Sequence, residues 1–383
     1  MMLAEMGAEV IKVEPPWGAL GRIEERGPMY GGAAPTFHHL NLGKKDIVIN
    51  LKEPKGIELV KKLLAKSDVI ISNFAPGTME KMGLDYDECK KVRPNIIYGV
   101  ISGFGDTGPY RPYSSYAPVA EAIAGFARQM GDTIDPAGPP KGLVGFFGDL
   151  APGTLMAMAV IAAIRYRDKT GKGQKIDLAQ FDSMFAYNTG VTTFWVTGKN
   201  EAERKKDDEE RKKNAPDRDP IQQIGGYLKV KDGYIMVAGM RPKAIDALKE
   251  KLKVEELTKE LVLETIANMT RMEAFHFFAE MGMPCSPCYY ASETPDDPQI
   301  IAREMITQVD HPILGKMKAI NFPVKMSETP GKVLSAAPLL GQHQKEIITQ
   351  LLGYSQEEFE ALVQGGIIAY QPDIDKQIEN WKK

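Results

Sequence analysis

KDIVINLKEPKGIELVKKLLAKSDVII, the stretch at residues 45–71, decides the fold. Its two ends are short apolar runs typical of β-strands, and residues 54–65 between them carry apolar side chains at helical spacing. Further strand-like runs lie at residues 8–13 and 96–101. Strands that alternate with helices in this way predict an α/β fold, with a Rossmann-like large domain whose parallel sheet binds ligands at the carboxyl ends of its strands.

A run of charged residues and prolines at residues 201–220 predicts the connection between two domains. A hairpin around Asp232-Gly233 then begins a second α/β region. The length of 383 residues also suits one or two domains. We therefore expect four segments: the first part of the large domain at residues 1–198, a charged linker at 199–221, a smaller α/β domain at 222–325, and C-terminal helices at 326–383 that return to the large domain.

The composition, with 43% hydrophobic and 26% charged residues, is that of an ordinary soluble globular protein. A formal net charge of −3 gives no reason to expect a nucleic acid or a membrane as a partner, so a basic site must be local and suited to a small anion. The longest apolar stretch, residues 150–164, contains Pro152 and Gly153 and falls short of the roughly 20 residues of a membrane span. The sequence shows no secretory signal, and we expect a cytoplasmic protein.

Two local patterns are set aside on chemical grounds. Cys285 and Cys288 form a C-x-x-C pair, but no second cysteine or histidine pair completes a metal site. The sequence GFGDTG at residues 103–108 fits the nucleotide motif G-x-G-x-x-G, but Pro109 and Pro112 follow at once. Because no helix can open there to bind a pyrophosphate, we predict a loop.

Asp149 ends the segment GFFGD, which precedes a helix-forming run of small apolar residues. A carboxylate at this junction lies near a helix N-terminus, where unpaired N–H groups stabilise negative charge. The local sequence fits two interpretations, a simple N-cap and a reactive carboxylate.

Seven separated segments decide between these interpretations by resemblance. They are LAEMGAEVIKVEPP at 3–16, NLGKK at 41–45, NFAPG at 73–77, SGFGDTGPY at 102–110, TGKGQ at 170–174, DHPILG at 310–315 and APLLGQH at 337–343. The ordered set covers nearly the whole chain and resembles the family III CoA-transferases, the group that contains formyl-CoA and carnitine CoA-transferases.

The resemblance implies that Asp149 is the catalytic residue of a CoA-transferase. Its carboxylate would attack an acyl-CoA thioester and form a mixed anhydride, then an enzyme-bound CoA thioester, from which a small carboxylic acid takes the CoA. The coenzyme A thioester is then a substrate, and no permanent cofactor or metal is needed.

The resemblance also implies a set of CoA contacts. Arg22 and Lys52 correspond to phosphate or ribose contacts, Asn73 and Phe74 to the adenine side, and Lys81 stands where the family often has arginine. Without the resemblance, Lys52 and Lys81 read equally well as solvated surface lysines, and Phe74 as an ordinary core residue.

Two further positions bear on the pocket. Tyr116 is expected to contact CoA, and with Phe146 and Phe147 it favours an acyl group larger than formyl. Gly225-Gly226 resembles a glycine loop that covers the active aspartate in transferases, although a glycine pair before a strand is also a common turn.

Two other functions stay open. An α-methylacyl-CoA racemase of the same superfamily would need a histidine within residues 114–119, where Tyr116 stands, and no histidine lies between His39 and His276. That absence favours a transferase. A non-catalytic CoA-binding subunit, paired with a homologue, is the second alternative.

The resemblance further implies an interlocked homodimer, with CoA near the domain interface. Family members begin with a strand and a glycine-containing loop ahead of the LAEMGA segment, which this sequence lacks. We expect a start placed too late rather than an incomplete site, since losing a strand would expose its neighbours in a parallel sheet.

Overall fold

The computed structural model describes residues 1–23, 29–135, 137–214, 225–239 and 242–369, together with residues 376 and 379. The chain divides into two compact units, one made of residues 1–192 and 304–383 and the other of residues 193–303. Residues 304–325, which the sequence assigned to the smaller domain, belong to the larger unit.

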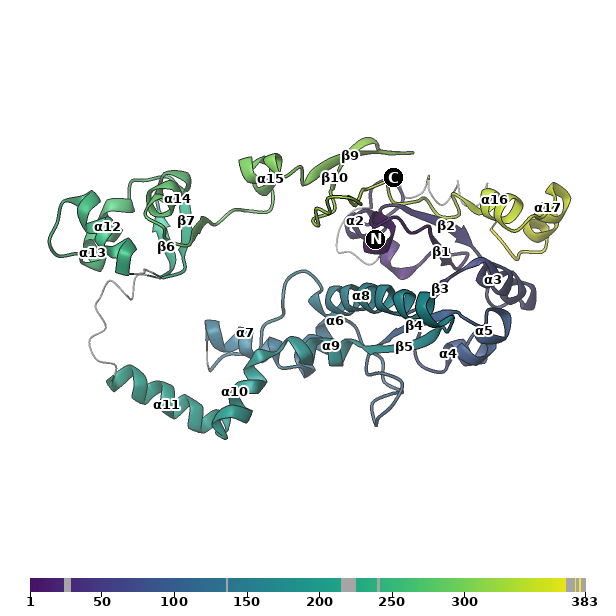
Figure 1. Ribbon diagram of the computed structural model, residues 1–383, viewed down its shortest axis with the longest axis horizontal. Helices are drawn as coiled ribbons and strands as arrows, with labels where there is room; N and C mark the ends of the chain where they lie inside the picture. Colours follow the sequence, from purple (N-terminus) through teal and green to yellow (C-terminus); the bar gives the residue numbers. More distant parts are fainter. Residues whose placement is uncertain are drawn as a thin grey trace. The chain divides into compact units, whose positions relative to one another are not determined.

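The larger unit contains two parallel ladders of strands (Figure 1). Strand β1 (Val10–Glu14) pairs with β2 (Lys44–Val48), and Val10 lies opposite Lys44. The second ladder has the order β3 (Val69–Ser72), β4 (Ile97–Ser102), β5 (Gln174–Ala179). The expected parallel strands of an α/β fold are confirmed, although among the described residues they form separate ladders of two and three strands.

Helix α3 (Pro54–Lys66) follows the predicted spacing, because its buried residues Leu59, Val60, Leu63 and Leu64 form one face. This face packs into a core that also includes residues of β2, β4 and the C-terminal region. The C-terminal region contributes Ile347, Ile348, Ile367 and Ile368 to that core.

Helix α8 (Phe147–Thr170) carries Asp149 and begins three residues earlier than its apolar run suggests. It packs against β4, β5, α6 (Ala117–Ile123) and α9 (Gln180–Tyr187). Figure 1 shows α8 running alongside the three-stranded ladder. Its 24 residues are long and apolar enough to cross a membrane by length and composition alone, a test that core helices of soluble proteins also pass. The earlier argument from the short stretch 150–164 therefore does not hold.

Shorter elements complete the larger unit. They are α1 (Met2–Glu5), η1 (Leu20–Arg22), α2 (Pro35–Leu40), α4 (Thr78–Lys81), α5 (Tyr86–Val92), α7 (Phe126–Ile134), the antiparallel pair β9 (Ile306–His311) and β10 (Gly315–Ile320), α16 (Gln344–Glu346), the π-helical turn η4 (Ile347–Leu351) and α17 (Gln356–Gln364). The predicted loop at residues 103–108 is confirmed, since Gly105 and Gly108 adopt positive φ and no helix begins there.

The smaller unit has a core of its own, centred on residues such as Ile235, Leu248 and Phe278. The predicted hairpin is confirmed as β6 (Gly226–Val230) and β7 (Gly233–Val237), and β8 (Cys285–Pro287) pairs with β7. Its helices are α12 (Pro242–Leu252), α13 (Lys259–Ile266), α14 (Arg271–Glu280), η3 (Thr294–Asp296) and α15 (Pro298–Ala302). Helix α10 (Thr189–Thr197) spans the boundary, and the charged run forms helix α11 (Glu201–Asn214), while residues 215–224 lie outside the described residues.

Candidate active site

Asp149 is the third residue of α8, so its carboxylate lies at the N-terminus of a long helix as predicted. The N-cap is Phe146, which has left-handed backbone angles (φ 57°, ψ 43°) and no side-chain cap. The N-cap interpretation of Asp149 is therefore wrong. A carboxylate in the first turn of a helix is stabilised by the partial positive charge of the helix N-terminus.

Gly148 fixes the position of this helix end. Its backbone N–H donates a hydrogen bond of 3.0 Å to Oε1 of the buried Glu121 on α6. A Cβ atom at Gly148 would lie 2.4 Å from the carbonyl oxygen of Ala117 and 2.6 Å from its Cα atom. The backbones of α6 and α8 thus touch where only glycine fits.

Gln180 holds the Asp149 carboxylate and was missed by the sequence analysis. It is the first residue of α9, directly after β5, and its side chain is buried. Its amide Nε2 donates a hydrogen bond of 2.5 Å to Oδ1 of Asp149. Its place at the carboxyl end of a parallel strand is the signal that could have found it.

Tyr116 lies at the same junction, because it precedes Ala117, whose backbone touches Gly148. Its side chain is 59% exposed, and those of Phe146 and Phe147 are also exposed. The structure therefore brings Tyr116 and Asp149 to one place on the surface of the larger unit.

Asn73 and Phe74 follow β3, at the edge of the ladder where Gln180 follows β5. Phe74 is 45% exposed, so the interpretation as a core residue is wrong. Lys81 ends the short helix α4 and is exposed. Whether these residues contact CoA stays a prediction.

Lys52 and Arg22 follow the strands of the other ladder, and they differ in burial. The Lys52 side chain is exposed, with its ammonium 5.0 Å from the ring centroid of the exposed Trp17. The Arg22 guanidinium is buried over the Phe37 ring and donates to Glu14 at 2.9 Å and to the Pro338 carbonyl at 3.1 Å. Arg22 thus has a structural role in the described chain, and its contact with CoA stays a prediction.

Asp46 completes the buried cluster around Arg22, at 3.5 Å from the guanidinium. Burial, together with the neighbouring Glu14 carboxylate, raises the pKa of Asp46 to about 8. Burial opposes ionisation of Glu14 as well, but the hydrogen bonds and positive charge of Arg22, together with Asp46 and Lys12, outweigh it and lower the pKa of Glu14 to about 2. One arginine therefore neutralises one ionised carboxylate, and Asp46 keeps its proton at neutral pH.

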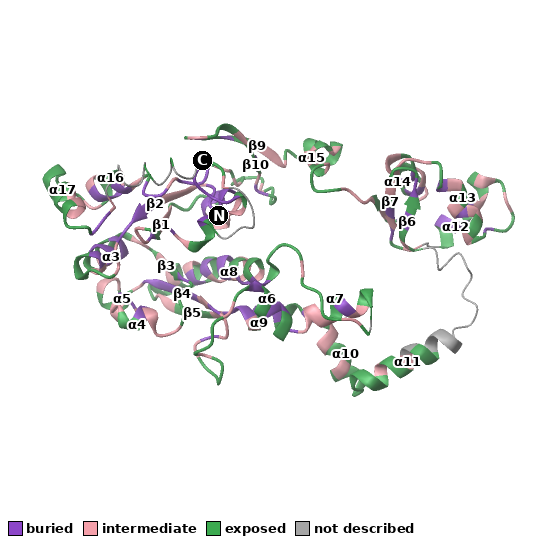
Figure 2. Ribbon diagram, turned by 180° about the vertical axis from the view of Figure 1, so that it is seen from behind, coloured by how far each residue is buried: buried purple, intermediate pink, exposed green. Residues whose placement is uncertain are grey.

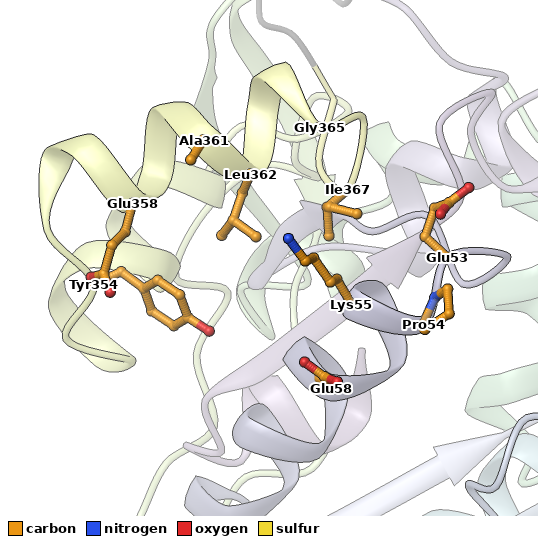
Figure 3. Close-up of a pocket in the computed structure, with 10 residues that line it drawn as sticks. All are labelled: Glu53, Pro54, Lys55, Glu58, Tyr354, Glu358, Ala361, Leu362, Gly365 and Ile367. Atoms are coloured by element: carbon orange, nitrogen blue, oxygen red, sulfur yellow. The ribbon is translucent and has the colours of Figure 1, made fainter.

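An open hollow of about 640 Å³ lies between α3 and α17 (Figure 3). Its walls include Glu53, Glu58 and Glu358, with Lys55 as the cationic group. None of the predicted site residues lines it. Three carboxylates against one ammonium make this hollow unsuitable for the phosphates of CoA.

In the smaller unit, Gly225 is exposed, and Gly226 begins β6 with a φ of 95° that suits glycine. Its predicted role over the aspartate is untested. Among the residues that the structure describes, no group of three or more His, Cys, Asp or Glu side chains could hold a metal ion. Cys285 and Cys288 are free thiols.

Comparisons with known proteins all indicate the same family, and the matches cover most of the chain. The model of the family described as CoA-transferase family III matches residues 1–344. The chain is 31% identical to the human succinyl-CoA:glutarate CoA-transferase, over 96% of this chain and 85% of that protein. It is 29% identical to the beta subunit of a succinyl-CoA–L-malate CoA-transferase from Chloroflexus aurantiacus, over 94% of this chain and 91% of that subunit. A crystal structure of a CAIB/BAIF family protein from Brucella suis matches with a TM-score of 0.76 and 29% identity, and the match covers 91% of this chain and 93% of that protein.

Proposed function

Because the chain belongs to CoA-transferase family III, we propose that it moves CoA from an acyl-CoA to a carboxylic acid through an acyl-enzyme formed on Asp149. One observation carries the assignment to this residue. An aspartate carboxylate stands at the N-terminus of a long helix, with one oxygen held by a buried amide and its backbone fixed by a glycine contact.

The reaction proceeds in four steps on this carboxylate. An oxygen of Asp149 attacks the thioester carbonyl carbon, the C–S bond breaks, and CoA leaves as a thiolate from a mixed anhydride. The thiolate attacks Cγ of Asp149 and releases the donor acid, which leaves an aspartyl-CoA thioester. The acceptor carboxylate attacks Cγ in turn and expels the thiolate, forming a second anhydride. The thiolate finally attacks the acceptor's acyl carbon and restores Asp149.

The donor acid of this chain is proposed from its relatives. Two of them are named for succinyl-CoA, and the aromatic side chains of Tyr116, Phe146 and Phe147 are exposed, which is compatible with contact to an acyl group larger than formyl. We propose succinyl-CoA as the first donor to test, with dicarboxylic acids as acceptors.

Lys52, Asn73, Phe74 and Lys81 are the proposed CoA contacts on the surface of the larger unit. Each is exposed, as a contact to a soluble ligand must be before it binds. The ammonium groups would meet the phosphates, and the exposed Phe74 ring would offer a flat face to the adenine.

A dimer is proposed from the outer face of α8. Figure 2 shows both buried and exposed residues along this helix, and the exposed ones include Met158 (62%) and Ile161 (46%). A second copy of the chain would bury this apolar surface. One relative is named as a beta subunit, so a heteromer with a homologue is the alternative. The mass of the particle in solution, measured by light scattering, separates a monomer from either assembly.

Intact-protein mass spectrometry tests the proposed mechanism. The protein is incubated with a panel of acyl-CoAs and then with hydroxylamine, and Asp149→Ala is the control. A hydroxylamine-sensitive adduct on Asp149 supports the transferase, and the acyl-CoA that labels identifies the donor. CoA binding without any adduct would overturn it. Exchange of the α-proton of a branched acyl-CoA would then indicate a racemase, and no exchange a non-catalytic subunit.

A further inference from the structure

The hydrogen bond from Gln180 to Asp149 is short, and its donor is a buried side chain. The two atoms are 2.5 Å apart, and the amide comes from a side chain that is 9% exposed. Only the amide nitrogen can donate to a carboxylate oxygen, so the orientation of the Gln180 amide follows from its partner. We infer that Gln180 is the oxyanion donor for the acyl group of Asp149 itself, an inference that rests on the proposed function.

The four steps place developing charge at two different carbonyl groups. In the first and last steps the attacked carbon belongs to the substrate. In the second and third steps it is Cγ of Asp149, first in the anhydride and then in the thioester. Each attack on Cγ pushes an electron pair onto the carbonyl oxygen of Asp149, and that pair returns when the C–O or C–S bond breaks.

Gln180 stands where this charge develops. When one carboxylate oxygen becomes part of the anhydride, the other is the carbonyl oxygen, and the structure holds Oδ1 against the Gln180 amide. A donor within hydrogen-bond distance of an oxyanion stabilises the transition state more than the ground state. The N-terminus of α8 acts on the same group in the same direction.

A neutral amide suits this position better than a cation. A lysine or arginine at 2.5 Å would form an ion pair with the resting carboxylate and make it a poorer nucleophile in the first step. The amide stabilises the resting carboxylate less and strengthens as charge accumulates on the carbonyl oxygen. Its location directly after β5 and at the start of α9 fixes its side chain before substrate arrives.

The test compares Gln180→Met, which keeps the length and removes the donor, with Gln129→Met. Gln129 on α7 donates its amide to Asn188 at 2.9 Å, so the control loses a similar hydrogen bond elsewhere in the same unit. Release of the donor acid in the first turnover is followed by rapid quench. We expect the rate to fall about a hundredfold or more in Gln180→Met, with the KM for acyl-CoA unchanged, and no change in Gln129→Met. A rate within about threefold of the wild type would overturn the inference.

Hydroxylamine trapping separates an oxyanion donor from a residue that only positions Asp149. If the attack on Cγ is slow, the first anhydride accumulates, and hydroxylamine releases the donor acid as its hydroxamate above the Asp149→Ala background. If Gln180→Met instead forms no anhydride, its role is positioning and the inference fails. A wild-type enzyme with no adduct on Asp149 would refute the proposed function itself, which is a different outcome.

A measurement on the wild type covers the case in which Gln180→Met does not fold. The infrared carbonyl band of the aspartyl-CoA thioester is recorded in the folded enzyme and compared with that of a model aspartyl thioester in an aprotic solvent, where the carbonyl oxygen accepts no hydrogen bond. We expect a lower frequency in the folded enzyme, because a hydrogen bond to the carbonyl oxygen weakens the C=O bond. A frequency equal to that in the aprotic solvent would show that no donor contacts this oxygen.

Discussion

Asp46 is expected to make the folded protein less stable as the pH rises. Its ordinary pKa is 3.8, and burial beside Glu14 raises the pKa to about 8 in the folded chain. Between these values the folded state holds a proton that the unfolded state has released. The free energy of unfolding therefore falls with increasing pH across this window, by about 1.4 kcal/mol per pH unit for a single group.

Asp46→Asn removes this titration and keeps the contacts. The asparagine Oδ1 still accepts the 2.6 Å hydrogen bond from the Gly341 N–H, and its amide nitrogen takes the place of Asp46 Oδ2, which has no hydrogen-bond partner among the described residues. From pH 6 to pH 8 the variant should therefore gain about 2.3 kcal/mol on the wild type, which is less than the full 1.4 kcal/mol for each of two units because Asp46 is half ionised in the folded state at pH 8.

Urea unfolding of both proteins at pH 6, 7 and 8, at one protein concentration, measures the difference. Asp297→Asn is the matched control, because hydrogen bonds from the backbone N–H of Gln299 lower the pKa of Asp297 and it stays ionised throughout this range. A difference between Asp46→Asn and the wild type that does not change with pH would refute the reasoning. It would show that Asp46 is ionised and that Arg22 neutralises both carboxylates.

Three further changes have defined outcomes. Gly148→Ala should lower Tm and activity, because the clash with the α6 backbone reduces the free energy of unfolding by about 1–3 kcal/mol. Gly153→Ala in the same helix is the control, since its added Cβ atom meets no atom within 4 Å and should keep or raise Tm. His311, whose pKa burial and the neighbouring histidine lower to about 4, should contribute a loss of stability of about 1.4 kcal/mol per pH unit as the pH falls below about 6.5. In urea unfolding, His311→Asn should lack this contribution, so the difference between variant and wild type should change by that amount per pH unit, and a constant difference would refute the prediction. Lys52→Ala and Lys81→Ala should each raise the KM for acyl-CoA about two- to fivefold with kcat unchanged, and the increase in KM should shrink with added salt. If the KM of one variant is unchanged at low salt, that lysine does not belong to the CoA site.

Periodicity predicted the parts of the fold that depend on local pattern. The strands around residues 45–71 and helix α3 follow from apolar spacing, because each buries one face against the same core. The start of α8 did not follow, since an N-cap at Asp149 was one of two interpretations of the local sequence, whereas the helix begins after Phe146, which has a left-handed conformation. Gly148 near this helix start touches the backbone of α6, a contact that the local sequence does not encode.

The partners of the site residues could not be predicted for a related reason. Gln180 reaches Asp149 across 31 residues, and Arg22 reaches the Pro338 carbonyl across 316. Arg22 was expected to contact a phosphate or the ribose because of its position within the family's motifs. Its guanidinium is instead buried between Glu14 on β1 and Asp46 on β2. These two strands are neighbours in the sheet but are separated in the sequence. Such contacts are properties of the packed fold.

In the proposed mechanism, the arrangement around Asp149 divides the reaction between a fixed group, the Asp149 carboxylate, and a moving one, the CoA thiolate. Three contacts hold the nucleophile: the Gly148 backbone against α6, the Gly148 N–H on Glu121, and the Gln180 amide on Asp149. The thiolate of CoA, in contrast, must attack Cγ in one step and the acceptor's acyl carbon in another, so it has to move between two carbons. The proposed contacts of the exposed Lys52 and Lys81 suit that requirement, because they would hold the distant phosphates and leave the thiol end mobile. The same division explains why an oxyanion donor fixed on the enzyme's own acyl group serves both attacks on Cγ without any rearrangement of the protein.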